Sequence, residues 1–434
     1  MINRARTSIV FLTGVAFALT LTHEQQANAD KPKRKWIQST AYAVPKHTVS
    51  DGEGYFAIVE GHNRRLYIGT HKNATNCWLV EFDPATKTMR PVVDAHKAIG
   101  TVATGFSAQA KVHTRNNVGK KTGKIYFATK QGYPAPGEPR IVYPGGYPMV
   151  YDPATETIKV YPIAVPHQGI ISITPDESRG LAYISTCSDS RPIESTHFMV
   201  LDLATGKYKD LMDCENSYAF VVVDYRGRAY HPIRGGDIAR YDPETKTLER
   251  LKQTIDGKPP VAESHLADEY GHPLNWDISP DGKTLFSQPM STNALYSYDL
   301  MQEGGTLDGR FLGPLLPGAK GTDCRAMCVG PSGTAWCAVT EMVDGVNLSH
   351  LVRYAPGDKV PIDLGPVAIS NPDFTPFHDE KGNGLPFHHG IVKKYGVTTT
   401  IRVTLGVCEA RDGSVYILAI HPYTLQQISP DQLR

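Results

Sequence analysis

Imidazole, ammonium and guanidinium groups recur at the ends of short apolar segments of this sequence. The clearest set runs Gln109-Ala-Lys111-Val-His113, and Thr129-Lys130-Gln131 follows the next apolar segment. An imidazole can take up or release a proton near neutral pH, and a lysine or arginine can hold a carboxylate through charge-assisted hydrogen bonds. The residue types therefore suit the binding of an anionic substrate and acid–base chemistry on it.

A repeated strand signature supplies the elements that would position these groups. Turns with Gly or charged residues precede apolar–aromatic alternation at 65–70, 124–129, 181–186, 227–230, 282–286, 333–337 and 413–417. A second repeated feature, an Asp-x-x-Thr turn with Pro in three of four copies, starts at Asp83, Asp152, Asp202 and Asp242. Seven copies of a four-strand unit predict an all-β fold, a seven-bladed β-propeller of four-stranded blades with loop insertions.

The ends and loops of the chain suggest its organisation. Residues 1–29 have the basic start, apolar run and Ala27-Asn-Ala29 cleavage site of a secretory signal peptide. We expect 30–50 to be a basic lead-in, 51–434 to be the propeller domain, and the protein to be secreted or periplasmic after cleavage near Ala29. No later stretch approaches the ~20 apolar residues of a membrane helix. The largest insertion, 356–394, is rich in Pro, Gly and His, and long loops on a rigid repeat commonly carry function.

Composition excludes several classes of function. Lys and Arg number 45 and Asp and Glu 44, so there is no basic excess for nucleic acid. The 41% hydrophobic and 21% charged residues are typical of a globular protein. Seven cysteines without a CxxC pair, several of them in apolar strands, predict buried structural thiols; a disulfide or a zinc cluster around Cys324 and Cys328 is the alternative.

Most candidate residues fall on one face of the predicted propeller. The innermost strands line a central channel, and the loops entering them share a mouth with the ends of the second strands. His113 falls at mid-strand, in register with Ser172, Val222, Asp277, Cys328 and Cys408, as part of a channel-facing ring. Substrate binding is expected of residues that converge on the mouth: Gln109, Lys111, His71, Lys130, His167, Arg234, His272, Asn275, Trp276, Arg325, His388 and His389.

The segment from Phe106-Ser-Ala-Gln-Ala-Lys-Val-His113 to residue 129 resembles exported propeller polysaccharide lyases of the ulvan lyase, oligogalacturonate lyase and rhamnose–glucuronate lyase type. The likeness extends to the architecture of most of the mature chain. It implies a channel histidine, matched by His113, often with a second histidine or a tyrosine. Where the second histidine is expected, after the following strand, this chain has Lys130-Gln131, so a different chemistry stays open.

The resemblance implies β-elimination at a uronic acid in an anionic polysaccharide or oligosaccharide. A cation neutralises the carboxylate, a base removes the C5 proton, and an acid protonates the leaving O4. We assign the base to His113 and the acid to Tyr183 or Tyr218. The carboxylate ligands are expected among Arg325, Lys111 and Arg234.

Two other classes of function are compatible with the sequence. A gluconolactonase-type hydrolase would need a divalent metal at the channel mouth, for which Asp277, Asn275, Glu409 and Asp323 offer oxygen ligands. A non-catalytic propeller that binds glycans or proteins would use the same fold. The sequence requires no cofactor, and it does not determine the oligomeric state.

Overall fold

The computed structural model describes residues 35–50, 54–187, 195–214, 220–233, 235–260, 274–290, 292–319, 322–385 and 388–434. Trp36–Arg434 forms one compact unit. The compact unit thus begins before residue 51, where we expected the domain to start, and the expected signal peptide lies outside the described residues. Within the described ranges, no helix combines the length and apolar character needed to cross a membrane.

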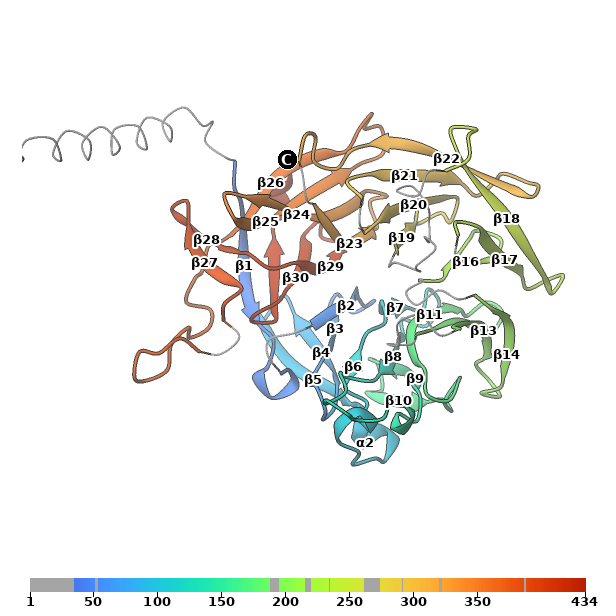
Figure 1. Cartoon of the computed structure of the whole chain (residues 1–434), viewed down its shortest axis with the longest axis horizontal. Coiled ribbons are helices and arrows are strands. Elements are labelled where there is room, and N and C mark those ends of the chain that lie inside the picture. Colours follow the sequence, from blue (N-terminus) through green and yellow to red (C-terminus); the bar gives the residue numbers. More distant parts are fainter. Residues whose placement is uncertain are drawn as a thin grey trace, which may run out of the picture. The chain divides into compact units, whose positions relative to one another are not determined.

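The first half of the chain forms three antiparallel sheets in sequence order (Figure 1). The first sheet is β2 (Gly54–Glu60), β3 (Leu66–Thr70), β4 (Trp78–Asp83) and β5 (Thr88–Asp94), and the short helix α2 (Ala95–Ile99) follows it. The second is β6 (Lys111–Val112), β7 (Asn117–Val118), β8 (Ile125–Lys130), β9 (Pro148–Asp152) and β10 (Thr157–Val160). The third is β11 (Gly169–Asp176), β12 (Leu181–Cys187), β13 (His197–Asp202) and β14 (Tyr208–Asp213).

An eight-stranded sheet follows, in which two meanders join edge to edge. The first meander is β15 (Val222–Val223), β16 (Ala229–Pro232), β17 (Ile238–Asp242) and β18 (Thr247–Ile255). The second is β19 (Leu274–Ile278), β20 (Thr284–Pro289), β21 (Leu295–Asp299) and β22 (Thr306–Gly313). Their outer strands β18 and β22 pair in parallel and so connect the two meanders.

The last sheet has ten strands and contains both ends of the compact unit. Its strands are β23 (Asp323–Val329), β24 (Ala335–Val343), β25 (Val346–Tyr354), β26 (Ile362–Ile369), β27 (Ile391–Lys394), β28 (Val397–Thr400), β29 (Thr404–Glu409), β30 (Val415–Ala419), β31 (Thr424–Ile428) and β1 (Ile37–Ala43). Short 3-10 turns occur at η1 (Lys46–Thr48), η2 (Gly105–Ser107), η3 (Arg140–Val142) and η5 (Pro430–Leu433).

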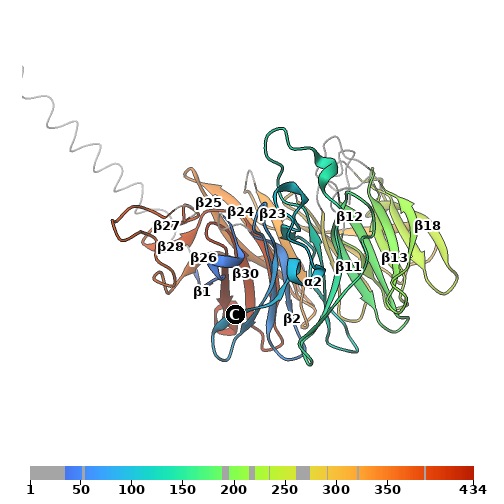
Figure 2. The same cartoon turned by 90° about the horizontal axis from the view of Figure 1, so that it is seen from below.

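The innermost strands contact one another in a closed cycle (Figures 1 and 2). β2 contacts β7, β7 contacts β11, and the cycle continues through β15, β19, β23 and β29 back to β2. Phe56, Phe220 and Asn275 of this cycle line a small cavity of about 10 Å³. The arrangement is propeller-like. A larger cavity, of about 450 Å³, opens among residues of the inner strands, including Asn117 on β7, Ser172 on β11 and Val222 on β15.

The residues that we expected in a lead-in include a strand that closes the ring. β1 pairs antiparallel with β31, next to the C-terminus, and parallel with β26. The hydroxyl of Ser39 donates to the carbonyl of Ala368 at 2.9 Å and lies 2.9 Å from Oε1 of Gln426, so it ties the two neighbouring strands together.

Hydrophobic cores form between successive sheets. One core joins Tyr67 and Leu79 of the first sheet to Val112 and Phe127 of the second, all with 0% exposure. Burying side chains of this size is the main favourable contribution to folding, at about 25 cal/mol per Å² of apolar surface. All seven cysteines are buried, which confirms the expectation of buried cysteines.

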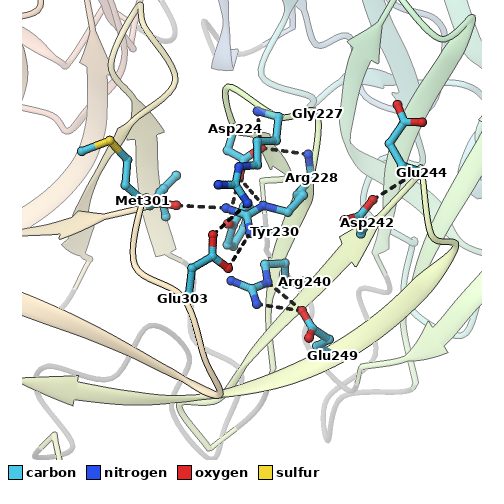
Figure 3. Close-up of polar contacts among 12 residues, drawn as sticks. Asp224, Gly227, Arg228, Tyr230, Arg240, Asp242, Glu244, Glu249, Met301 and Glu303 are labelled. Carbon is cyan, nitrogen blue, oxygen red and sulfur yellow. Dashed lines mark hydrogen bonds and ion pairs between the residues drawn. The ribbon is translucent and has the colours of Figure 1, made fainter.

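Polar contacts reinforce the junction of the two joined meanders (Figure 3). Arg228 on the β15–β16 turn donates to Asp224 at 2.7 Å and to the carbonyl of Leu300, after β21, at 3.0 Å. Tyr230 donates to the same carboxylate at 3.0 Å, and Glu303 lies 3.7 Å from the guanidinium of Arg228. Because these charges are paired, the cluster is a structural junction.

Candidate functional site

Four basic side chains from the first two sheets lie close together, and we call them the basic cluster: His71, Lys111, His113 and Lys130. Their exposed fractions are 1%, 1%, 2% and 0%. All four were predicted as site residues, three for substrate binding and His113 as the base. The structure brings them together although they come from the ends of three strands, β3, β6 and β8, and lie up to 59 positions apart in sequence (130 − 71).

Strand register explains why these residues meet. Lys111 on β6 pairs directly with Lys130 at the end of β8, and His71, just after β3, bridges Lys111 from the other side. Directly opposed residues on neighbouring strands have adjacent side chains, and like charges in such positions destabilise a sheet. The register of these strands thus gathers the basic side chains of His71, Lys111 and Lys130 at one place in the structure, where they could bind an anion.

Two tyrosines cover the basic cluster. Nζ of Lys111 lies 3.5 Å from the ring centroid of Tyr133 and 5.1 Å from that of Tyr55, so both rings make cation–π contacts with it. The Tyr55 and Tyr133 hydroxyls hydrogen-bond to each other. The Tyr55 ring also meets the His113 ring edge-on, with centroids 3.9 Å apart. Tyr133 is 46% exposed, so this pair lies between the basic cluster and solvent.

The environment of His113 keeps its imidazole neutral. Burial lowers the pKa of His113 well below its usual value, and the nearby positive charges of Lys130, Lys111 and His71 lower it further. A neutral imidazole can accept a proton, as a general base must. A carboxylate bound beside the lysines would offset their charge and raise the proton affinity of His113.

Gln109 stabilises the segments that carry the basic cluster. Its Oε1 accepts hydrogen bonds from the hydroxyls of Thr129 at 2.7 Å and Tyr143 at 2.8 Å, and its Nε2 donates to the carbonyl of Gly145 at 2.9 Å. Both the oxygen and the nitrogen of this amide therefore bond to the protein. Gln109 thus holds the segment before β6 against β8 and the β8–β9 connection.

Two predicted residues, Tyr183 and Trp276, lie in the cores between sheets. Tyr183 is fully buried against Phe198 and Tyr241, and its hydroxyl donates to the carbonyl of Gly227 at 3.3 Å. Trp276 is fully buried in another core, and its indole N–H donates to the carbonyl of Phe220. The structure does not bring either side chain to the basic cluster.

Other predicted residues are separate from the basic cluster on the surface or at the axis. Arg325 is bound to Asp323 through Nε, at 2.8 and 2.9 Å from its two carboxylate oxygens. His167 is exposed and contacts the carbonyl of Tyr143 through Nδ1. Asn275 lines the small axial cavity and donates to the carbonyl of Cys324 at 3.3 Å.

The two histidines of the insertion belong to a different cavity, of about 970 Å³. His388 and His389 line it together with Phe377, His378 and Lys393. His389 also stacks on His421, with ring centroids 4.5 Å apart. The expected sites Tyr218, Arg234 and His272 lie outside the described residues.

The oxygen ligands expected of a lactonase do not form a metal site in the described part of the chain. Asp277 is paired with Arg115, Asp323 with Arg325, and Glu409 accepts from the hydroxyl of Ser332. Among the residues that the structure describes, no group of three or more His, Cys, Asp or Glu side chains is placed to hold a metal ion.

Sequence reasoning left Tyr55 out of the site, and it singled out the segment with Gln131 without assigning that residue a role. β2 has a β-bulge between Gly54 and Ile58, so Tyr55 and Phe56 both reach His113 although they are consecutive. A bulge breaks the two-residue alternation on which such assignments rest. For Gln131, the only signal in the sequence is that it directly follows Lys130, a predicted site residue.

No family model matches the chain, and no curated protein matches it. A solved chain of a mitotic checkpoint complex shares 8% identity with it, with a TM-score of 0.50 over 92% of this chain and 94% of that chain. The extracellular domain of a hybrid two-component system from B. thetaiotaomicron shares 14% identity, with a TM-score of 0.48 over 91% of this chain. This chain spans only 41% of that one. At these identities the likeness shows the fold alone, which is β-propeller-like.

Proposed function

We propose that this protein is an exported polysaccharide lyase that cleaves uronic-acid-containing glycans by β-elimination, with the basic cluster as its active site. The architecture would be a seven-bladed propeller. The sheets support that count when the eight- and ten-stranded sheets are divided at their parallel pairs, β18 with β22 and β26 with β1. The last blade would then combine β29, β30 and β31 with the N-terminal strand β1.

The single observation that carries the proposal is the buried row of His71, Lys111 and Lys130 beside a neutral His113. Elimination at a uronate requires negative charge on the carboxylate to be stabilised while the neighbouring carbon loses its proton. Buried cations stabilise such charge more strongly than exposed ones, because the local dielectric constant is low. A base adjacent to these cations completes the minimal set of groups.

The mechanism uses residues of the basic cluster and its tyrosine cover. Lys111 and Lys130 hold the carboxylate, and His113 takes the C5 proton. The C5–H electron pair forms the C4=C5 double bond as the C4–O4 bond breaks. Tyr55, whose ring contacts His113, replaces Tyr183 as the acid that protonates O4. Proton transfer from His113 back to the phenolate restores both groups.

The test is ultraviolet absorbance of the unsaturated product during incubation with a panel of uronate polysaccharides. The wild-type protein should produce the signal on at least one polymer, and His113→Gln should lower the rate by about 10²-fold or more. His62→Gln, at an exposed histidine on the β2–β3 turn, is the matched control and should keep the rate. No signal across the panel, or full activity of His113→Gln, would contradict the proposal.

A second pair of variants tests the assignment of the acid. Tyr55→Phe should lower the elimination rate strongly, because it removes the proton donor and keeps the ring against His113. Tyr183→Phe should leave the rate unchanged, since that hydroxyl only donates to the carbonyl of Gly227 inside a core. The opposite ranking would restore Tyr183 as the acid.

A further inference from the structure

Gln131 has a buried acceptor that the protein does not use. The residue follows Lys130 directly after β8 and is only 2% exposed. Its Oε1 is enclosed and has no hydrogen-bonding partner among the described residues. Buried carbonyl oxygens are nearly always hydrogen-bonded, because leaving one without a donor opposes folding. An acceptor in this state is suited to receive a hydrogen bond from a ligand.

Gly169, the first residue of β11, provides the space for this acceptor. A methyl group added at residue 169 would lie 2.5 Å from Oε1 of Gln131 and 2.4 Å from Cγ of Lys130. Both side chains therefore pass over the same α-carbon. Gly169 is not among the glycines with positive φ, so its backbone conformation would allow another residue. Glycine is therefore required at residue 169 because a side chain there would collide with Gln131 and Lys130.

We propose that Gln131 and Gly169 form a hydroxyl-recognising subsite beside the basic cluster. This inference rests on the proposed function in one respect, namely that the substrate carboxylate is held by Lys111 and Lys130. With the carboxylate there, a hydroxyl of the same sugar ring donates to Oε1 of Gln131. The subsite discriminates a hydroxylated acid such as a uronate from a carboxylate on a plain hydrocarbon ring.

Calorimetric titration of the mature protein with two small acids tests the subsite without requiring catalysis. The probes are D-glucuronate and cyclohexanecarboxylate, which share a six-membered ring and a carboxylate but differ in their hydroxyls. We expect Gln131→Leu to reduce the ratio of the two association constants by about tenfold, the effect of one neutral hydrogen bond. Its affinity for cyclohexanecarboxylate should stay at the wild-type value.

Two further variants make the result specific. Gly169→Ala should also lower the ratio, because its methyl group displaces both Gln131 and Lys130. Gln427→Leu is the matched control and should keep the ratio, since Gln427 lies on β31 and accepts from the hydroxyl of Tyr42. Thermal unfolding of each variant verifies that it is folded.

The possible outcomes separate this inference from the proposed lyase activity. An unchanged ratio in a folded Gln131→Leu protein would overturn the subsite, and so would a wild-type protein that binds neither acid. A reduced ratio together with no cleavage of any polymer would support the subsite and contradict the lyase proposal.

Discussion

Burial determines how the individual histidines of this protein respond to pH. His113 and His231 are both enclosed, and burial lowers the pKa of each, that of His231 to about 4. The His231 ring lies between the hydroxyl of Ser185, at 2.8 Å from Nε2, and the carbonyl of Pro232, at 2.7 Å from Nδ1. Both imidazoles are therefore neutral in the native protein at neutral pH, and protonation would disrupt their surroundings.

Acidification should consequently destabilise the protein through His231. In the unfolded chain a histidine has a pKa of about 6.5, so the unfolded state takes up a proton in the range from there down to about 4, while the native state does not. Stability is thus present above about pH 6.5 and is lost as the pH falls. Between pH 7 and pH 4 the wild-type protein should lose about 3 kcal/mol more than His231→Gln.

Urea unfolding of both proteins at several pH values measures this difference. His62→Gln, at an exposed position, should follow the wild-type curve. Parallel curves for the wild-type protein and His231→Gln would show that the native structure does not lower the pKa of His231.

The repeated hairpin turns show how an element tolerates an unfavourable backbone conformation. In each copy the Asp accepts a backbone N–H two residues later, for example Asp83 from Ala85 at 2.9 Å and Asp242 from Glu244 at 2.8 Å. The fifth residue of each turn has positive φ, at Lys87, Glu156, Gly206 and Lys246. Only one copy uses glycine, the residue that adopts this conformation without steric cost.

Glycine at the fifth position should stabilise the other copies. We expect Lys87→Gly and Lys246→Gly each to raise the free energy of unfolding by up to about 1 kcal/mol, because the left-handed conformation costs a non-glycine residue about that much. Gly206→Ala should lower it by a similar amount. Chemical denaturation measures the free energy of unfolding of the three variants. A destabilised Lys87→Gly would mean that the lysine side chain stabilises the turn by more than its backbone strain costs.

β1 shows the limit of reading elements from local sequence. The strand signature correctly locates the second strands, such as β3, β8, β12 and β30, because each is flanked by its own turn. The partners of β1 lie more than 300 positions away, so nothing beside Ile37–Ala43 indicates that they pair. We expected this segment in a lead-in because the basic run 31–35 directly precedes it.

Removing β1 should therefore damage the fold more than removing what precedes it. A chain that starts at Lys35 keeps every pair of β1, whereas one that starts at Val44 exposes the edges of β26 and β31. We expect the thermal midpoint of the shorter chain to fall by about 10 °C or more. Equal midpoints for the two chains would show that β1 does not close the ring.

At the scale of the whole molecule, one ion pair connects distant parts of the ring. Arg115, just before β7, pairs with Asp277 on β19 and donates to the carbonyl of Trp276 at 2.7 Å. Asp277 in turn accepts from the backbone N–H of Val329 on β23 at 2.6 Å. The two side chains are only 19% and 15% exposed. The pair thus fixes three inner strands across the axis.

Breaking this ion pair should lower the free energy of unfolding of the whole ring. Asp277→Asn and Arg115→Met should each cost about 2–4 kcal/mol, because each leaves a largely buried group without its ionic partner. The double variant should cost clearly less than the sum of the two, which a double-mutant cycle in urea measures. Additive losses would mean that the two residues act independently.

The same strand illustrates why only part of the site was predictable. Asn275 and Asp277 face the axis, and Trp276 between them is buried in a core, as alternation along a strand requires. The sequence provides the alternation, but a shift of one residue reverses it. For the second sheet, Lys111 and His113 were both predicted on the face that the structure gives them. For β19, Trp276 was predicted on the site face, but its side chain lies in the core. Positions of loops, such as that of His389, depend on contacts with no periodic signal.

The central claim is that the basic cluster supports cleavage by elimination. The most direct test is to digest a uronate polysaccharide in water enriched in a heavy isotope of oxygen and to measure the masses of the products by mass spectrometry. Elimination breaks the C4–O4 bond without adding water, so the account predicts unsaturated products without label, formed by the wild-type protein and by His62→Gln but not by His113→Gln. Products that carry one heavy oxygen per cleavage would identify a hydrolase and contradict the account.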